Sequence, residues 1–594
     1  MKINIPEFNF SIDPSKGNFL FNYKNIYPQP FIHKDSSLNS LIILGRPHIK
    51  GKSGIEEIKD RFIEQGNFDQ SFLQRIDGEF LMLIFNKNSH KISIISDRFS
   101  SLPMYYFLDN QVFYGSNNYA DLIKLASKNN TFHLQKNNFF EFLWFRRLHN
   151  NITYDNLIKV MMPARVLDVQ AGSVSEKKYW EPSFSKNQFT LSQSTEALRI
   201  AILGAVKQKI DLIGEKNFGL FLSGGMDTRT ILAAFHALNI DLPECFTLGY
   251  TPDGEFRIAR QLTDFTGANH HFLKMSPNTY DQFWPEKARL AGGMHHQLQN
   301  IFIGLENQSL ANTSVFFHGH GFDYLFQGMY LSASPLKIFN KNLHLKTINN
   351  LNNVKNFAKF YSENVPYRAW RVNLQEYLLP QFKEELMSHL YENIQSIENQ
   401  GREICNDNFD LWEYMMIHSL SRHYSQTDVM GMGTYGEQIK VANDNTLFDT
   451  YLSMPIKHRK YARAMRGALR EMSPELANIH SANTGNRMSA GPVENLSLFA
   501  YRKILRTFSS SNKYKNPTAE RRTWPNEDDQ VRNMKLLNRA VSSLHQSDHL
   551  REALPYIDFN LLQSNTKDWL DNGRPGGGQF LMCLLSIDSF LKSI

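Results

Sequence analysis

Residues 219–235 read Gly-Leu-Phe-Leu-Ser-Gly-Gly-Met-Asp-Thr-Arg-Thr-Ile-Leu-Ala-Ala-Phe, and this stretch carries most of the information on fold and function. The apolar run 218–222 predicts a buried strand, 223–225 a tight turn, and the spacing from Thr228 onward a helix. Backbone N–H groups and the positive end of the helix dipole then face the turn, where they favour an anion such as phosphate. Asp227 would repel a bare phosphate but suits a Mg²⁺ ion that bridges phosphates. Taken alone, the stretch is also compatible with an ordinary strand-to-helix turn.

Composition limits the class of protein. The chain has 594 residues, which is enough for two or more domains, and 42% hydrophobic and 21% charged residues, as in soluble globular proteins. The formal charge of +7 without a long basic run argues against a dedicated nucleic-acid binder. The three cysteines form no disulfide framework, so we expect a cytoplasmic protein, and no apolar run is long enough for a signal or a membrane span.

The pattern of apolar runs predicts an α/β protein in three parts. Residues 1–185 are rich in strand signals and form the first predicted domain. Residues 186–500 alternate helices with short apolar strands, which is typical of a parallel sheet covered on both faces. Residues 501–594 are expected to form a helical extension, with a basic stretch over 502–522 that is expected to be a solvated face.

The turn also resembles a known signature. Ser-Gly-Gly-Met-Asp-Thr is similar to the pyrophosphate-binding loop of ATP pyrophosphatases, Ser-Gly-Gly-x-Asp-Ser/Thr, enzymes that cleave ATP between the α and β phosphates. No lysine follows the glycines, so the loop differs from that of kinases and GTPases. The resemblance implies that this loop contacts ATP through the following residues: Leu222, Ser223, Gly224, Gly225, Asp227 and Thr228.

Three further segments follow in the order found in asparagine synthetases. Residues 245–250 resemble the strand whose end contacts adenine, which implies that Leu248 and Gly249 do so here. Residues 317–326 resemble Ser-Gly-Glu-Gly-Ala-Asp-Glu-Leu-Phe, which places Gly319 beside the nucleotide and makes Asp323 a second Mg²⁺ ligand with Asp227. Residues 428–455 align without gaps to a fourth motif. On these motifs, which cover about residues 35–480, the chain is identified as a member of the asparagine synthetase superfamily.

The first domain resembles a class-II glutamine amidotransferase domain without its nucleophile. The segments Asp77–Phe80, Ser96–Phe99, Leu102–Tyr106 and Val112–Ser116 follow the order and spacing of that family, which implies an Ntn-hydrolase-like αββα sandwich. The family needs an N-terminal cysteine, but residue 2 is lysine and the first cysteine is Cys245. Leu44-Gly45 also stands where the family has its oxyanion Asn-Gly pair. We therefore expect no glutamine hydrolysis.

Three positions of the second domain bear on catalysis. His320 occupies a position that is glutamate in asparagine synthetases and tyrosine in β-lactam synthetases, where it works with the glutamate that matches Glu437. A His320–Glu437 dyad could serve as the base for an amine, or His320 could bind a phosphate or fill the loop. The family's phosphate-binding lysine is missing, and Arg487 is its candidate replacement for holding ATP.

The expected reaction is therefore an ATP-dependent ligation with ATP and Mg²⁺ as cofactors. A small-molecule or peptide carboxylate would be activated as an acyl-adenylate and passed to an amine. The alternatives left open are an intramolecular cyclase like lasso-peptide or β-lactam synthetases, ammonia-dependent amidation of a sugar acid, and a non-catalytic nucleotide-binding homologue. The expected partners are the acid and the amine, with a homodimer or a pathway enzyme as a further possibility and no nucleic acid.

Overall fold

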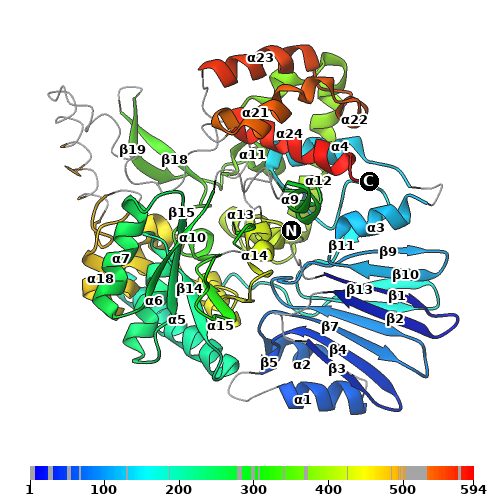
Figure 1. Cartoon of the computed structure of the whole chain (residues 1–594), viewed down its shortest axis with the longest axis horizontal. Helices are drawn as coiled ribbons and strands as arrows, with labels where there is room; N and C mark the ends of the chain where they lie inside the picture. The colour runs from blue at the N-terminus through cyan, green and yellow to red at the C-terminus, as the bar shows by residue number, and fades with distance from the viewer. Residues whose placement is uncertain are drawn as a thin grey trace.

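In the computed structural model, two of the three predicted parts share a layered α/β architecture around separate sheets (Figure 1). The structure describes residues 7–594 apart from the following gaps: 25–30, 50–54, 66–67, 129–131, 186, 277–283, 296–301, 306–307, 339–340, 367–371, 424–425, 483–484, 492–493, 495–496, 499–500, 502–530 and 573–576. The whole basic stretch 502–522 thus lies outside the described residues.

Two antiparallel sheets form the sandwich of the first domain. Their strand orders are β11-β9-β10-β1-β2 and β13-β12-β8-β7-β4-β3. The strands are β1 (Glu7–Asp13), β2 (Asn18–Lys24), β3 (Phe31–Asp35), β4 (Asn39–Gly45), β7 (Phe80–Asn86), β8 (Ile92–Ser96), β9 (Tyr105–Asp109), β10 (Val112–Ser116), β11 (Lys159–Val160), β12 (Arg165–Gln170) and β13 (Ser173–Lys178). Alternating apolar side chains of both sheets, such as Phe10, Leu83 and Ile94, meet in one buried core between them.

Helices cover the outer faces of this sandwich. Ile58 of α1 (Ile55–Asp60) and Phe72 of α2 (Gln70–Arg75) pack on the face of the six-stranded sheet that carries Ile43 and Met82. On the other side, α3 (Tyr119–Ala126) lies against β9 and β10. The layers are helix, sheet, sheet and helix, which confirms the predicted αββα sandwich.

The second domain is built on a parallel sheet of order β16-β15-β14-β17-β20. Its strands are β14 (Phe218–Phe221), β15 (Glu244–Gly249), β16 (His270–Lys274), β17 (Val315–His318) and β20 (Glu437–Lys440). Helix α6 (Asp227–Ala237) contacts β14 and β17 on one face, and Val429 and Met432 of α14 (Gln426–Met432) pack with Phe316 on the other. This architecture confirms the predicted doubly covered parallel sheet.

The strand order reverses between β14 and β17. From β14 the chain proceeds to β15 and β16 on one side and then to β17 and β20 on the other. In sheets of this kind the loops diverge at such a switch point and leave a crevice at the carboxyl ends of the strands. The switch point therefore lies where the sequence places the loops after Phe221 and His318.

Helices form the upper part of the molecule in Figure 1. They are α4 (Lys136–Phe145), α9 (Trp284–Ala291), α11 (Phe357–Asn364), α12 (Pro380–Arg402), α13 (Asn408–His418), α21 (Lys535–Ser542), α22 (Asp548–Ala553), α23 (Phe559–Asn572) and α24 (Gly577–Leu591). Helix α24 packs against α4 and α9, and α4 also contacts α12. The C-terminal helices therefore bridge segments that are far apart in the sequence.

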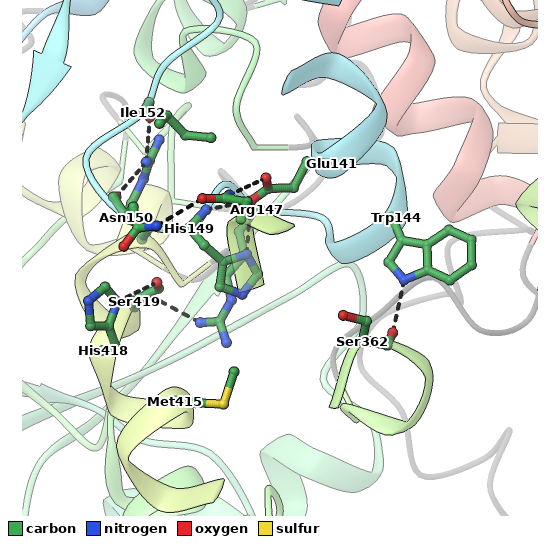
Figure 2. A network of polar contacts seen from close by, with 12 residues as sticks. Glu141, Trp144, Arg147, His149, Asn150, Ile152, Ser362, Met415, His418 and Ser419 are labelled. Carbon is green, nitrogen blue, oxygen red and sulfur yellow. Dashed lines mark hydrogen bonds and ion pairs between the residues drawn. The ribbon is translucent and has the colours of Figure 1, made fainter. Parts of the chain in front are cut away.

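A buried polar network fixes α4 to these helices (Figure 2). Glu141 accepts hydrogen bonds from the backbone N–H of His149 at 2.7 Å, from its Nδ1 at 2.9 Å and from Asn393 Nδ2 at 2.6 Å. Trp144 Nε1 donates to the carbonyl of Ser362 at 2.9 Å. Because buried polar groups need partners, these bonds tie the end of the first predicted domain into the helical part.

Candidate active site

The loop after β14 is fixed by hydrogen bonds within the loop and to the neighbouring strand β15. The Ser223 N–H donates to Thr228 Oγ1 at 3.0 Å, and the Gly225 N–H donates to Ser223 Oγ at 3.2 Å. Leu222 is anchored to β15, because its N–H donates to Phe246 O at 2.8 Å and its carbonyl accepts from Thr247 Oγ1 at 2.7 Å. Helix α6 begins at Asp227 with Met226 as N-cap, which supplies no side-chain cap. The first-turn N–H groups are thus available to an anion.

The loop after β17 packs directly on the start of α6. A Cβ atom added to Gly319 would lie 2.5 Å from Asp227 Cβ and 3.0 Å from the Thr228 nitrogen, so only glycine permits this approach. Asp323 lies in the short helix α10 (Phe322–Leu325) that follows. The structure therefore brings together the two loops that the sequence assigns to Mg²⁺–ATP.

Asp227 and Asp323 repel each other in a buried setting. Burial and the charge of Asp323 raise the pKa of Asp227 well above its ordinary value, and burial raises the pKa of Asp323 to about 6. Gln327 donates to Asp227 Oδ1, and the Tyr324 N–H donates to Asp323 Oδ1 at 3.0 Å. In the described part of the chain neither carboxylate has an ion pair with a cationic side chain. Two desolvated carboxylates without a countercharge are a poor arrangement unless a cation binds between them.

The donor set fits Mg²⁺. Among the described residues no group of three or more His, Cys, Asp or Glu side chains could hold a metal ion alone. Asp227 and Asp323 would supply two hard oxygen ligands, while phosphate oxygens and water would complete the shell that Mg²⁺ prefers. Bound there, the ion would neutralise phosphate charge.

The end of β15 lies beside the same crevice. Leu248 and Gly249 end this strand, and the Gly249 carbonyl accepts from the Met275 N–H at 2.9 Å. The neighbouring histidines are engaged locally: His270 Nε2 lies 2.9 Å from Thr247 Oγ1, and His271 pairs with Glu244 at 2.5 Å. Both histidines thus make local contacts with the neighbouring strand.

The structure contradicts the predicted His320–Glu437 dyad. Glu437 pairs with Val315 at the amino end of the sheet, whereas His320 follows β17 beyond its carboxyl end. Glu437 instead binds Arg46, with Nη2 2.9 Å from Oε2, and Lys216 at 3.1 Å. The alignment of residues 428–455 fixes the order of the residues, but it does not show at which end of the sheet Glu437 lies.

His320 has other neighbours. Its ring centroid lies 5.9 Å from that of Tyr324, 6.0 Å from His318 and 6.2 Å from His423. Burial, together with the charge of Lys440, lowers the pKa of His320 to about 3, so the imidazole is neutral at pH 7.

Arg487 lies on a loop that packs on the Ser-Gly-Gly turn. The Ala482 N–H donates to the Gly224 carbonyl at 3.3 Å, and His480 and Arg487 form an isolated β-bridge. The guanidinium itself binds Glu494, with Nη2 2.9 Å from Oε1, in an exposed position. The role of Arg487 toward phosphate stays a prediction.

Sequence reasoning missed the residue that locks this loop. Arg229 is completely buried and donates to four backbone carbonyls: Gly224 at 3.2 Å, Leu476 at 3.1 Å, Ile479 at 2.7 Å and His480 at 2.9 Å. Burial lowers its pKa to about 10. An arginine on the apolar side of the predicted helix was the only available signal. No sequence signal indicated Gln327 or Lys440, because the residues that they contact lie far away in the sequence.

Comparison with known proteins gives matches in both sheet domains. The family model described as a glutamine amidotransferase domain matches residues 36–180, and that described as asparagine synthase matches residues 197–478. Within the described residues, none of the helices combines the length and apolar character needed to cross a membrane.

Two relatives point the same way. Asparagine synthetase (glutamine-hydrolyzing) 1 of Bacillus subtilis (strain 168) is 24% identical over 281 residues, 46% of this chain and 43% of that protein. A probable asparagine synthetase (glutamine-hydrolyzing) of Acanthamoeba polyphaga mimivirus is 24% identical over 272 residues, 43% of this chain and 42% of that protein. The matches thus span less than half of either relative.

Among solved structures, the allosteric regulatory enzyme of purine biosynthesis is similar over 45% of this chain and 59% of that chain, with 8% identity. Its TM-score of 0.19 is too low to support an argument. The two family models, over residues 36–180 and 197–478, and the two relatives support assignment of this chain to the asparagine synthetase superfamily.

Proposed function

We propose that this chain is an ATP-dependent ligase that activates a carboxylate as an acyl-adenylate and transfers the acyl group to an amine. The observation that carries the proposal is the buried pair Asp227 and Asp323, which has no cationic partner among the described residues and lies beside the Ser-Gly-Gly turn at the switch point. This is the charge arrangement that Mg²⁺-bound triphosphate would complete.

The chemistry proceeds in two balanced steps. A carboxylate oxygen attacks the α-phosphorus of ATP, the bond to the β-phosphate oxygen breaks, and pyrophosphate leaves. The amine nitrogen then attacks the acyl carbon, AMP leaves with the electron pair of the C–O bond, and the nitrogen loses a proton. The turn N–H groups and the α6 terminus would stabilise charge on the phosphates, and the two loops would hold the reactants in line.

His320 serves in this proposal as the group that accepts a hydrogen bond from the amine. Its imidazole is neutral at pH 7 because burial and Lys440 lower its pKa to about 3. The negative charge of a bound triphosphate would raise this pKa and strengthen it as a base. No carboxylate partner for the ring is implied, since Glu437 lies at the other end of the sheet.

Glutamine does not supply the amine in this proposal. Residues 1–244 contain no cysteine and Cys245 is buried in β15, so none of these positions offers the N-terminal thiol that the amidotransferase family uses. Free ammonia, or an amine of a small-molecule or peptide substrate, takes its place.

The test measures products with defined amines. Purified protein is incubated with Mg²⁺–ATP and a panel of carboxylic acids, with ammonium or with glutamine, and AMP, pyrophosphate and glutamate are quantified. We expect acid-dependent AMP and pyrophosphate, amide formation with an amine, and no glutamate above the enzyme-free blank. Formation of ADP and phosphate would overturn the proposed reaction, and glutamate release would overturn the proposed loss of glutaminase.

A second candidate, a nucleotide-binding homologue without ligase activity, is favoured by one observation. The only arginine proposed to replace the family lysine is bound to Glu494 at the surface. Tight Mg²⁺–ATP binding without turnover of any acid would support this candidate.

A further inference from the structure

The first domain lies along the last strand of the parallel sheet. β20 ends the order β16-β15-β14-β17-β20, yet all four of its residues are buried. Two residues of the first domain contact its ends: Arg46, which follows β4, and Glu79, which follows the short strand β6 (Ile76–Asp77). The first domain is therefore in direct contact with the proposed ligase domain.

The contact has two charged attachment points at opposite ends of β20. At the amino end, Glu437 binds Arg46 and Lys216. At the carboxyl end, Glu79 binds Lys440 twice: Oε1 accepts from the backbone N–H at 2.9 Å, and Oε2 lies 3.3 Å from the ammonium group. The Lys440 side chain is only 3% exposed, so Glu79 is its countercharge in a desolvated place.

Lys440 lies next to the reaction centre. It pairs with His318 across the parallel register, and its charge acts on both His318 and His320. Both ring nitrogens of the buried His318 lack a hydrogen-bond partner among the described residues. The charge of the ammonium group therefore reaches the histidines at the end of β17 and in the loop that follows it.

We propose that Glu79 is a positioning residue of the ligase site, contributed by the first domain, which acts by holding Lys440 at the end of β20 beside His320. This inference rests on the proposed function. The two oxygens of Glu79 fix both the backbone and the charge of Lys440, so the ammonium group cannot turn toward the phosphates or toward Asp323. The first domain would then be retained for the geometry of its partner domain rather than for chemistry of its own.

The test compares two variants that each remove one interdomain ion pair on the same strand. Glu79→Gln keeps the shape of the side chain but removes the countercharge of Lys440. Arg46→Met removes the attachment at the far end of β20. For each variant, the fraction of folded protein, the affinity for Mg²⁺–ATP, and kcat and KM for the acid are measured.

We expect Glu79→Gln to lower kcat by about tenfold or more with the Mg²⁺–ATP affinity within about threefold, because the cation next to the reaction centre is no longer fixed. Arg46→Met should keep kcat within about twofold per folded molecule, since it acts at the remote end. The double variant Glu79→Gln with Lys440→Met should recover a large part of kcat, because it removes the unpaired cation.

The outcomes separate the two proposals. If the wild type turns over but Glu79→Gln and Arg46→Met have equal kcat per folded molecule, Glu79 only joins the domains and this inference is wrong. Failure of the double variant to recover any activity would also contradict it. If the wild type converts no acid, the proposed function itself fails and the inference falls with it. Should Glu79→Gln not fold, Glu79→Asp, which keeps the charge on a shorter side chain, is compared with Arg46→Met by kcat per folded molecule in the same way.

Discussion

The buried acids at the two ends of the parallel sheet differ in their partners. At the amino end, Glu437 has both Arg46 and Lys216 as partners. At the carboxyl end, the partners of Asp227 and Asp323 among the described residues are amide donors and each other's charge, and the pKa of each is raised. Folding alone pairs the acid of the amino end, whereas a cation bound at the proposed site would pair the acids of the carboxyl end. Within one sheet, the paired acid joins two domains, and the unpaired acids mark the proposed binding site.

Replacing the acids of the carboxyl end should give the largest effect. Asp227→Asn and Asp323→Asn are each expected to lower ATP consumption by about a thousandfold or more, because phosphate charge is no longer neutralised. Without ligands, both variants should unfold at a higher temperature than the wild type, since an uncompensated buried charge is removed. Pyrophosphate release and thermal unfolding without Mg²⁺ measure the two effects.

The matched control is Asp264→Asn, which removes an exposed carboxylate of α7 (Gly254–Thr266) that pairs with Arg260. It should change neither quantity. If Asp227→Asn keeps wild-type pyrophosphate release, the metal site is wrongly assigned.

Replacing the acid of the amino end should lower stability and leave turnover nearly unchanged. Glu437→Gln leaves Arg46 and Lys216 without a countercharge, so we expect a loss of about 2 kcal/mol in the free energy of unfolding. Turnover per folded molecule should remain within about twofold of the wild type, because the residue is remote from the crevice. Denaturant titration and initial rates are the measurements. A fall in turnover as large as that of Asp227→Asn would restore the dyad with His320.

Low pH should destabilise the folded protein because His320, at the carboxyl end of the sheet, is buried. The folded-state pKa of His320 is about 3, below its unfolded value, so between these values the unfolded state binds more protons. Stability is then fully present above pH 6.5 and falls as the pH decreases, by about 1.4 kcal/mol per unit for this group. His320→Gln should flatten the dependence of the unfolding free energy on pH between 6.5 and 5. An unchanged slope would show that the ring is not desolvated.

The smallest effect is expected at the rim of the site. Arg487→Ala removes a guanidinium that binds Glu494 in an exposed position. Exposed ion pairs contribute little, so stability should change by less than about 1 kcal/mol and the Mg²⁺–ATP affinity by less than about threefold. Equilibrium binding of a fluorescent ATP analogue tests this. A tenfold loss of affinity would mean that Arg487 turns to the phosphates when they bind.

The sequence predicts one end of the sheet far better than the other. Ser223–Thr228 and Gly319–Asp323 are local motifs, because a strand, a turn and a helix start follow one another along the chain. The partners of Glu437 could not be found in this way, since Arg46 lies 391 residues earlier. The same holds for Glu79 and Lys440, whose contact joins two domains. Local periodicity gives strands and turns, but register and interdomain contacts depend on how distant segments pack.

The buried position of β20 has a consequence for any shortened form of this protein. A strand at the border of a sheet offers a row of unpaired backbone groups to other chains, and such borders initiate aggregation unless they are shielded. Here side chains of the first domain provide the shield, with Glu79 occupying the Lys440 N–H. Removing that domain would turn β20 into an open template for intermolecular strand pairing. The first domain would thus also keep the protein soluble by shielding this strand.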